Sequence, residues 1–405
     1  MTCRIIYLHR LEPTVSGQTI QVLRDYHALL SHGYEVHLFY RARQPLSQGD
    51  LDQWLARHGL SPSARFQCHC IAEGAAGKRR MYRAARALIA ASTDSVVIAA
   101  RTMDRAAAAV RLRRAGARGR VKVVMELHET ALPHRIYAEQ GRPLRAWLSR
   151  RTERRVLREV DGIIATVGSQ LPLLGESFPV HAPAVVLPNG VDLAAFDAPA
   201  GNAEHADGVF RLRYAGQFTA WKNSNAMIET LKFLPQSVML ELAGGKSETE
   251  PQTRDMIDAT AKRFGVEERV RYVGVLAPVD VPAFLRGADA LLLPLGDNMQ
   301  SRYFTSPMKL FDYAASGVPM IVARQPTTQS LVCDGREALM VKPGSAEDLA
   351  RAVVTLRQSP EMARILARQA REWVRQYSYP MRAARYHQFI GALLATRGHS
   401  GVTPD

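Results

Sequence analysis

The chain has 405 residues, is 47% hydrophobic and 22% charged, and carries a formal net charge of +15 with only 4 scattered cysteines. Its length suits two or three domains. Its apolar fraction excludes a disordered chain or a fibre. The cysteines suggest neither a disulfide framework nor a zinc site. No apolar run approaches the roughly 20 residues that cross a bilayer, and the first strand-like run is too short and too early for a secretory signal, so we expect a cytoplasmic protein.

The first half of the chain alternates short apolar runs with helical patterns. Nearly continuous apolar runs are typical of parallel strands covered on both faces. Between the first two runs, Val22, Tyr26 and Leu29 repeat at helical spacing before Gly33, which predicts a β-α-β unit with a right-handed crossover. We expect strands at residues 4–9, 34–40, 95–100, 122–127, 162–166 and 184–187.

The excess positive charge lies in one segment. Residues 78–158 contain 21 Lys and Arg against 6 Asp and Glu, and the remainder of the chain is neutral. Three runs in this segment have the pattern of helices with an arginine face and an apolar back. Such faces attract nucleic acid, an anionic membrane surface or a negatively charged substrate. An arginine-rich surface without a partner is an equally open alternative.

A connector and a second alternating series follow. Residues 197–208 are rich in Ala, Gly, Asp and Pro and lack an apolar period, which predicts an exposed linker. Ser345 has the spacing of a helix cap, and Pro380 interrupts the helical tail. We expect strands at residues 210–215, 238–243, 269–273, 290–293, 320–323 and 339–341.

The two series predict an α/β protein with two Rossmann-like, doubly wound domains facing a central cleft, in which ligands bind at the carboxyl ends of the strands. We expect an amino-terminal domain, a connector, a carboxy-terminal domain, and a last helix that packs back on the first domain. The corresponding residues are 1–196, 197–208, 209–378 and 379–405.

Three loops carry single residues suited to bind a phosphate or a hydroxyl group. Gly17 precedes a helix and lets the backbone approach a phosphate. His128 and Glu129 follow the strand at 122–127, where they can contact hydroxyls or developing charge. Lys222 stands near a helix start, where a cation is unfavourable unless an anion is bound. At each position an ordinary turn, rim or surface role is the alternative.

The segment YFTSPMKLFDYAASGVPMIVA combines several features. Ser306 and Pro307 are expected to begin a helix. The backbone N–H groups of Thr305, Ser306 and Met308 can then hold phosphate oxygens. Asp312 lies two turns along, where a carboxylate can accept both hydroxyls of a ribose.

These residues, in this order, resemble the retaining glycosyltransferases of the GT-B fold, specifically glycosyltransferase family 4. The resemblance covers nearly the whole chain and includes HET, VLPNGVD, YAGQF…WK, LELAGG, VRYVGVL, LRGADALLLPL and SPMKLFDYAASGVPMIVA. It implies transfer of a sugar, with retention of the anomeric configuration, from a UDP- or GDP-sugar to a glycan or lipid-linked acceptor in cell-surface polysaccharide or glycoconjugate synthesis. It implies no metal and no further cofactor.

The resemblance also implies residue roles. Lys222 would neutralise the leaving diphosphate, His128 would lie near the donor sugar together with Glu129, and these two roles make His128 and Lys222 the catalytic candidates. Asp312 stands in the place of the second glutamate of the family's E-x7-E element, which binds the ribose. The donor-binding residues would be Gly17, Gly216, Gln217, Lys222, Val273, Gly274, Thr305, Ser306, Met308, Lys309 and Asp312.

Three departures from the family pattern affect this interpretation. Phe304 stands where the first glutamate of E-x7-E would fall, so recognition of the sugar hydroxyls must differ. Gln217 replaces the arginine that often precedes the lysine, and Asp312 is one methylene shorter than glutamate. Lys309 would supply the charge that Gln217 lacks.

The basic helices lie in the domain that receives the acceptor in this fold. We expect them to hold the enzyme against the anionic inner face of a membrane, and a freely dissolved acceptor is the alternative. A GT-B nucleotide-sugar epimerase is a second candidate function. A nucleic-acid binder is disfavoured because the basic runs lack interleaved aromatic residues and a known binding motif.

Overall fold

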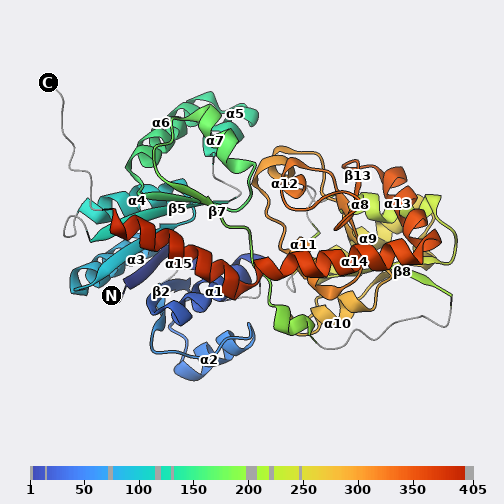
Figure 1. Ribbon diagram of the computed structural model, residues 1–405, viewed down its shortest axis with the longest axis horizontal. Helices are drawn as coiled ribbons and strands as arrows, with labels where there is room; N and C mark the ends of the chain where they lie inside the picture. The colour runs from blue at the N-terminus through green and yellow to red at the C-terminus, as the bar shows by residue number, and fades with distance from the viewer. Residues whose placement is uncertain are drawn as a thin grey trace. The chain divides into compact units, whose positions relative to one another are not determined.

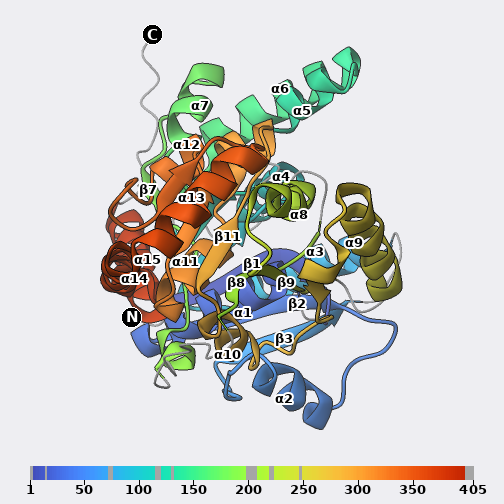
Figure 2. The ribbon, with the colours of Figure 1, turned by 90° about the vertical axis from the view of Figure 1, so that its right-hand side faces the viewer.

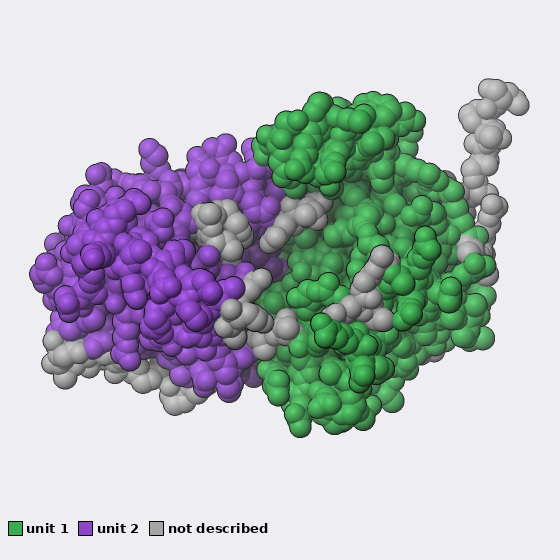
Figure 3. Space-filling view, turned by 180° about the vertical axis from the view of Figure 1, so that it is seen from behind, with its two compact units in different colours: residues 1–188, 379–405 green, residues 189–378 purple. Residues whose placement is uncertain are grey.

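The protein is described here from a computed structural model, in which residues 3–13, 16–71, 76–114, 120–128, 132–197, 208–218, 223–245 and 249–396 are described. The chain forms two compact units, distinguished in Figure 3. Unit 1 contains Met1–Pro188 and Tyr379–Asp405, and unit 2 contains Asn189–Ser378. The chain thus enters unit 2 before the expected connector, most of which lies outside the described residues.

Unit 1 is built on a seven-stranded sheet with the order β3-β2-β1-β4-β5-β6-β7. Every neighbouring pair is parallel, as the repeated β-α-β pattern predicts. The inner strand β5 is buried at every position, including its two charged residues, Lys122 and Glu126. The strands are β1 Cys3–Leu11, β2 Tyr34–Arg41, β3 Phe66–Ile71, β4 Ser95–Ala100, β5 Val121–Leu127, β6 Gly162–Ala165 and β7 Ala184–Val186.

Helices cover this sheet, and the last helix of the chain, α15, lies beside the first (Figure 1). Tyr26 of α1 and Tyr386 and Ile390 of α15 belong to one apolar core. Gly33 ends the first helical segment with a positive φ of 84°, as its position predicts. The helices are α1 Gly17–Ala28, η1 Leu29–His32, α2 Gln48–Ala56, α3 Ala76–Ala91, α4 Met103–Arg114, α5 Pro133–Glu139, α6 Pro143–Glu159, α7 Gln170–Ser177 and α15 Tyr379–Ala395.

Unit 2 contains a six-stranded parallel sheet with the order β10-β9-β8-β11-β12-β13. Alternate residues of β11 serve the two faces: Leu292 joins one core cluster, whereas Leu291 and Leu293 join the other. Five of the predicted strands have the expected bounds, and β10 is shorter than expected. The strands are β8 Phe210–Ala215, β9 Val238–Ala243, β10 Val270–Tyr272, β11 Ala290–Leu293, β12 Met320–Ala323 and β13 Leu339–Val341.

In unit 2, helix α11 packs next to the end of β8 and to α14 (Figures 1 and 2). Ser345 caps α13 as predicted, since its Oγ accepts a hydrogen bond from the Asp348 amide at 3.1 Å. The tail is interrupted between α14 and α15, also as predicted. The helical segments are η2 Leu193–Phe196, α8 Ser224–Thr230, η4 Leu231–Phe233, α9 Glu250–Phe264, η6 Glu267–Arg269, α10 Val281–Arg286, η7 Gln300–Phe304, α11 Met308–Ser316, α12 Pro326–Gln329, α13 Ala346–Gln358, α14 Pro360–Val374 and η8 Arg375–Tyr377.

Two features that would indicate other classes of protein are missing from the described residues. Within them, no helix has both the length and the hydropathy that crossing a membrane requires. In the same residues, no three His, Cys, Asp or Glu side chains gather as metal ligands would.

Candidate functional site

Three adjacent strands of unit 2 end in glycine turns that contact one another. Gly216 follows β8, Gly244 follows β9, and Gly274 lies just after β10. The Gly216 amide donates to the Ala243 carbonyl and the Gly244 amide to the Gly274 carbonyl, each at 2.8 Å. A Cβ on Gly244 would lie 2.3 Å from the Gly216 carbonyl oxygen. At these three glycines the edge of the sheet presents backbone without side chains. The edge lies at the carboxyl ends of the strands, where parallel α/β sheets bind ligands.

The β10 end of this edge contains Val273 and Gly274, two of the expected donor-binding residues. Val273 is half-buried, and Gly274 has a positive φ of 86°. A Cβ on Gly274 would lie 2.7 Å from Oε1 of Glu250, the first residue of α9. The Tyr272 hydroxyl donates to the Gly244 carbonyl at 2.6 Å. The loop after β10 is therefore fixed against both β9 and α9.

Helix α11 brings a lysine to the Gly216 turn. The Ala215 amide donates to the Tyr313 hydroxyl at 3.2 Å, which joins α11 to the end of β8. A Cβ on Gly216 would lie 1.8 Å from Lys309 Cε and 2.1 Å from its Nζ. The same Nζ lies 5.5 Å from the centre of the Tyr214 ring. Lys309 thus occupies the space that the missing side chain of Gly216 leaves.

The turn before α11 differs from the sequence expectation. The helix begins at Met308 and not at Ser306, because the Ser306 side chain has another partner. Its Oγ accepts a hydrogen bond from the Asn189 amide at 3.2 Å, and the Asn189 side-chain amide donates to the Ser306 carbonyl at 2.7 Å. The Thr305 hydroxyl donates to the Gln300 carbonyl at 2.9 Å. Both hydroxyls thus have structural partners, which leaves the backbone as the means by which this turn would contact a phosphate.

The remaining expected residues of unit 2 have varied surroundings. Phe304 is only 2% exposed, at the end of η7. Asp312 is half-buried on α11, three residues after Lys309. The Gln217 carbonyl accepts a hydrogen bond from the Tyr214 hydroxyl at 2.9 Å. Lys222, one of the two catalytic candidates, lies outside the described residues.

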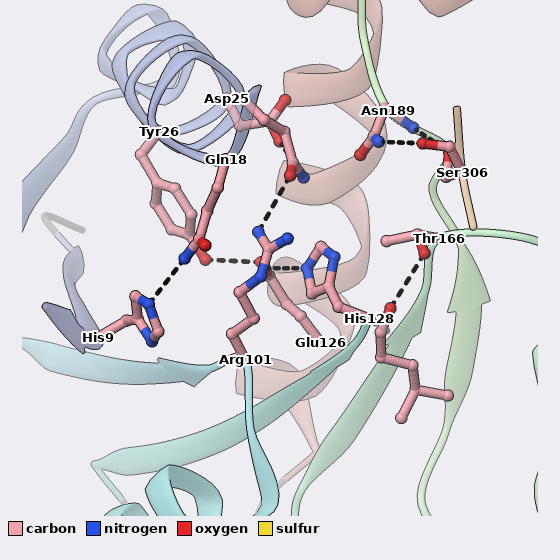
Figure 4. Close-up of polar contacts among 12 residues, drawn as sticks. His9, Gln18, Asp25, Tyr26, Arg101, Glu126, His128, Thr166, Asn189 and Ser306 are labelled. Atoms are coloured by element: carbon pink, nitrogen blue, oxygen red, sulfur yellow. Dashed lines mark hydrogen bonds and ion pairs between the residues drawn. The ribbon is translucent and has the colours of Figure 1, made fainter. Parts of the chain in front are cut away.

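In unit 1, His128 directly follows β5 and is buried, with 6% of its surface exposed. Its Nε2 lies 3.3 Å from Oε2 of Glu126, and the Tyr26 hydroxyl donates to the other oxygen of this carboxylate at 2.6 Å (Figure 4). An ionised carboxylate only accepts hydrogen bonds, so the imidazole proton belongs on Nε2. The Nδ1 atom of His128 is then the acceptor nitrogen of the ring.

A buried ion pair that was not predicted from the sequence joins α1 to α15 beside this group. Arg382 Nη1 lies 3.2 Å from Asp25 Oδ2, which also accepts a hydrogen bond from Gln21 Nε2 at 3.2 Å. Arg101 donates to Gln21 Oε1 at 3.0 Å. Gln21 and Asp25 are buried and lie four residues apart on α1. Two polar residues at that spacing on the apolar side of the predicted helix were the available signal.

Burial and charge set the protonation of these groups. Burial and the nearby charge of Arg101 lower the pKa of His128 to about 4, so its ring is neutral near neutral pH. Burial would raise the pKa of Glu126, but the hydrogen bond from His128 and the charge of Arg382 outweigh it and hold that pKa low. Burial raises the pKa of Asp25 to about 6, although Arg382 opposes this rise.

The amino-terminal loop contributes a capped helix start. Gly17 is the first residue of α1, and the Ser16 side chain caps this helix. Gln18 Nε2 lies 2.7 Å from His9 Nε2 at the end of β1. Burial and nearby arginines lower the pKa of His9 to about 4. Glu129, expected on the sugar side, lies outside the described residues.

Comparison with protein families gives two matches that follow one another along the chain. The model described as "Glycosyltransferase Family 4" matches residues 15–195, and the model described as "Glycosyl transferases group 1" matches residues 210–359. Together the matches take in the glycine turns of β8 to β10, Lys309 and the His128 group.

Known relatives are distant. A glycogen synthase of Mycobacterium tuberculosis is 26% identical over 258 residues, which are 61% of this chain and 59% of that protein. A mannosylfructose-phosphate synthase of Agrobacterium fabrum is 26% identical over 48% of this chain and 44% of its own length. The lipopolysaccharide core biosynthesis glycosyltransferase LpsE of Rhizobium meliloti is 31% identical over 40% of this chain and 42% of its own length. The alignments thus span about three fifths or less of these relatives.

Solved structures resemble the whole chain. The sucrose-phosphate synthase of Thermosynechococcus elongatus has a TM-score of 0.77 and 19% identity, and the likeness covers 97% of this chain and 99% of that one. Anabaena Alr3699/HepE, solved in complex with UDP-glucose, has a TM-score of 0.73 and 16% identity over 96% and 99% of the two chains. These likenesses confirm the predicted fold of two Rossmann-like domains.

Proposed function

We propose that this chain, whose two Rossmann-like units have the GT-B fold, is a glycosyltransferase that moves a sugar from a UDP- or GDP-sugar to a glycan or lipid-linked acceptor with retention of the anomeric configuration. The products would be a cell-surface polysaccharide or glycoconjugate. One observation carries the proposal: the Lys309 ammonium lies over Gly216 at the bare carboxyl edge of the unit 2 sheet. A lysine ammonium beside backbone that carries no side chains lets a diphosphate approach the positive charge closely.

Residues 209–378 would bind the donor. The turns at Gly216 and Gly274 let backbone approach the nucleotide, with the base against Val273 and Gly274. The backbone amides of Thr305, Ser306 and Met308 would donate to phosphate oxygens at the start of α11. Asp312, on the same helix, would accept the ribose hydroxyls. The predicted roles of Gly17 and Gln217 near the phosphates belong to the same proposal.

The chemical step would be assisted by positive charge on the leaving group. The bond between the anomeric carbon and the β-phosphate oxygen breaks, and a bond to the acceptor oxygen forms on the same face of the sugar. The acceptor proton passes to the departing phosphate oxygen. Lys309 and Lys222 would stabilise the charge that develops on the diphosphate, which is the largest kind of contribution a site of this type can make.

His128 and Glu129 would contact the donor sugar. A neutral imidazole whose Nε2 proton is engaged by Glu126 has Nδ1 available to accept a hydrogen bond from a sugar hydroxyl. Because the pKa of His128 is lowered to about 4, this role holds throughout the physiological pH range. His128 would thus orient the sugar and would not act as a base that changes its charge during the reaction.

The acceptor side would belong to residues 1–196. The basic helices within residues 78–158 would hold the enzyme against an anionic membrane surface, so that a lipid-linked acceptor reaches it from the bilayer. In this arrangement the enzyme works at the cytoplasmic face of the membrane. The last helix, α15, would support this domain from the carboxyl end of the chain.

Binding of nucleotide sugars tests the proposal. We would screen UDP- and GDP-sugars by thermal shift, because a ligand specific for the folded state raises its melting temperature. Lys309→Met should remove most of the shift, and Gly391→Ala, a glycine of α15 with no atom within 4 Å of its added Cβ, should retain it. An isomerised sugar formed from donor alone would favour an epimerase. A chain that no nucleotide diphosphate or its sugar stabilises would contradict the proposal.

A further inference from the structure

The first half of α6 contributes no buried side chain to unit 1. Residues 143–152 are exposed or half-buried, and the buried face begins at Glu153. Glu153 joins α6 to α5, since its carboxylate accepts a hydrogen bond from the His134 amide at 2.8 Å and another from the Ser149 hydroxyl at 2.7 Å. Figure 2 shows the α5–α6 pair extending from the rest of unit 1. About ten residues, roughly 15 Å of helix, thus stand on the surface.

This stretch of helix displays apolar side chains that the fold does not use. Leu144 is 69% exposed, Trp147 54% and Leu148 51%. The three lie at spacings of three and four residues, so they share one face. Nine large apolar side chains are exposed in the described part of the chain, and three of them lie here. Scattered exposed residues need no explanation, but a cluster of this kind marks an interaction surface.

Arginines flank the apolar cluster. The Arg151 guanidinium lies 4.9 Å from the centre of the Trp147 ring. As far as the chain is described, the ion pairs of α6 join Glu159 to Arg155 of the same helix and to Arg113 and Arg114 of α4, and Glu153 to His134 of α5. None of these pairs involves Arg145, Arg151 or Arg154. A hollow of about 530 Å³ is lined by Trp147, Arg151, Arg154, Arg155, Arg158 and Glu159.

The geometry points to the first half of α6 as the segment that docks unit 1 on an anionic lipid bilayer. Leu144, Trp147 and Leu148 enter the boundary between head groups and acyl chains, and the neighbouring arginines contact lipid phosphates. Helices that lie in a membrane interface combine such an apolar face with a cationic border, and tryptophan prefers the head-group level. The inference names the residues behind the membrane role under "Proposed function", and it rests on that role.

Other occupants explain the residues less well. Nucleic acid and acidic glycans would pair with the arginines but gain nothing from two exposed leucines. A second copy of the chain would cover the leucines, but a two-fold contact at this helix would place arginines against arginines. An anionic bilayer is the partner that satisfies the apolar and the charged side chains together.

Flotation with vesicles tests the inference without donor or acceptor. The full chain would be mixed with vesicles of phosphatidylcholine alone or mixed with phosphatidylglycerol. We expect recovery with the anionic vesicles only, lowered at least fivefold by the triple change Leu144→Ser, Trp147→Ser, Leu148→Ser. The matched control is Phe233→Ser, an apolar residue of unit 2 that is 45% exposed. It should float like the wild type.

A second pair of variants separates charge from apolar contact. Arg145→Glu combined with Arg151→Glu should lower recovery as strongly, and Arg364→Glu in α14, an arginine with 72% side-chain exposure, should not. Phosphatidylglycerol with brominated acyl chains should quench the wild-type fluorescence but not that of Trp147→Phe. Thermal shifts with donor should be equal in all these variants, so a failure of docking is separate from a failure of donor binding.

Three results would overturn the inference. Undiminished flotation of the triple variant would show that the apolar cluster does not enter the bilayer. Equal flotation with neutral and anionic vesicles would remove the role of the arginines. A wild-type dimer in sedimentation that the triple variant loses, with flotation unchanged, would identify the surface as a contact between copies.

Discussion

Replacing Gly216 with alanine would move Lys309 without removing its charge. The added Cβ would lie 1.8 Å from Lys309 Cε, whereas ordinary contact begins at 3.4 Å, so the end of the lysine must shift by about 1.6 Å. With an effective dielectric constant near 20, an ammonium and a unit negative charge attract by about 4 kcal/mol at about 4 Å and by about 3 kcal/mol at about 5.6 Å. The predicted loss is therefore about 1 kcal/mol, or about fivefold to tenfold in kcat/KM.

The assay is sugar transfer from the donor found by the thermal-shift screen, at a temperature well below the melting point of each variant. Lys309→Ala should lose at least about tenfold, because it removes the charge altogether. The double variant should be only slightly worse than Lys309→Ala, because the main clash of Gly216→Ala is with this lysine and only the strain at a φ of 158° and a contact of 3.1 Å with the Tyr214 hydroxyl remain. Gly391→Ala in α15 serves as the control and should keep the wild-type kcat/KM.

Two results would refute this reasoning. A Gly216→Ala variant with wild-type kcat/KM would show that the position of Lys309 does not matter to the reaction. Losses that multiply in the double variant would show that the two residues act separately. In either case Lys309 would not be the residue that compensates for the missing arginine at Gln217.

Three further predictions concern residues away from this contact. The pKa of His128 falls from 6.5 in the unfolded chain to about 4 in the fold, so the stability that the neutral ring contributes is full above pH 6.5 and is lost toward pH 4. His128→Gln should remove about 3 kcal/mol of the pH dependence of the unfolding free energy, measured with denaturant. An unchanged pH dependence would show that the ring in the fold binds a proton as readily as in the unfolded chain. Arg382→Met leaves the Asp25 carboxylate buried without its partner and should lower the unfolding free energy by about 3–5 kcal/mol. Adding Asp25→Leu should restore much of the melting temperature, and a double variant no more stable than the single one would contradict this. Phe304→Glu restores the family's acid at a site that is 2% exposed, so it should lower the unfolding free energy by about 3 kcal/mol or more without strengthening donor binding. The control Phe233→Glu, on the surface, should be tolerated. Tighter donor binding by Phe304→Glu would count against the observed packing.

Apolar patterning was sufficient to predict most of the fold. Parallel strands buried on both faces give continuous apolar runs, which is why β9, β11 and β12 have the expected bounds. The predicted start of α11 was wrong. Serine is a residue type that often caps helices, but the Ser306 hydroxyl accepts a hydrogen bond from the amide of Asn189, which lies 117 residues away in the chain. A local pattern cannot reveal a competing partner at that distance.

The candidate site was predicted in part for the same reason. Gly216 and Lys309 were each named from the sequence, but their contact depends on the packing of α11 against β8. The pair Asp25 and Arg382 was missed, because the two residues lie on the first and last helices and only the fold makes them neighbours. Polar residues on an apolar helix face were the one local sign of it.

Direct binding of nucleotides by the purified chain tests the central claim most directly. Calorimetric titration would compare UDP and GDP with UMP and GMP, for the wild type and for Lys309→Met. We expect one diphosphate to bind at least about tenfold more tightly than its monophosphate, and this preference to disappear in Lys309→Met. A wild type that binds no nucleotide, or a diphosphate preference that survives the loss of Lys309, would contradict the claim that this edge of unit 2 holds the leaving group.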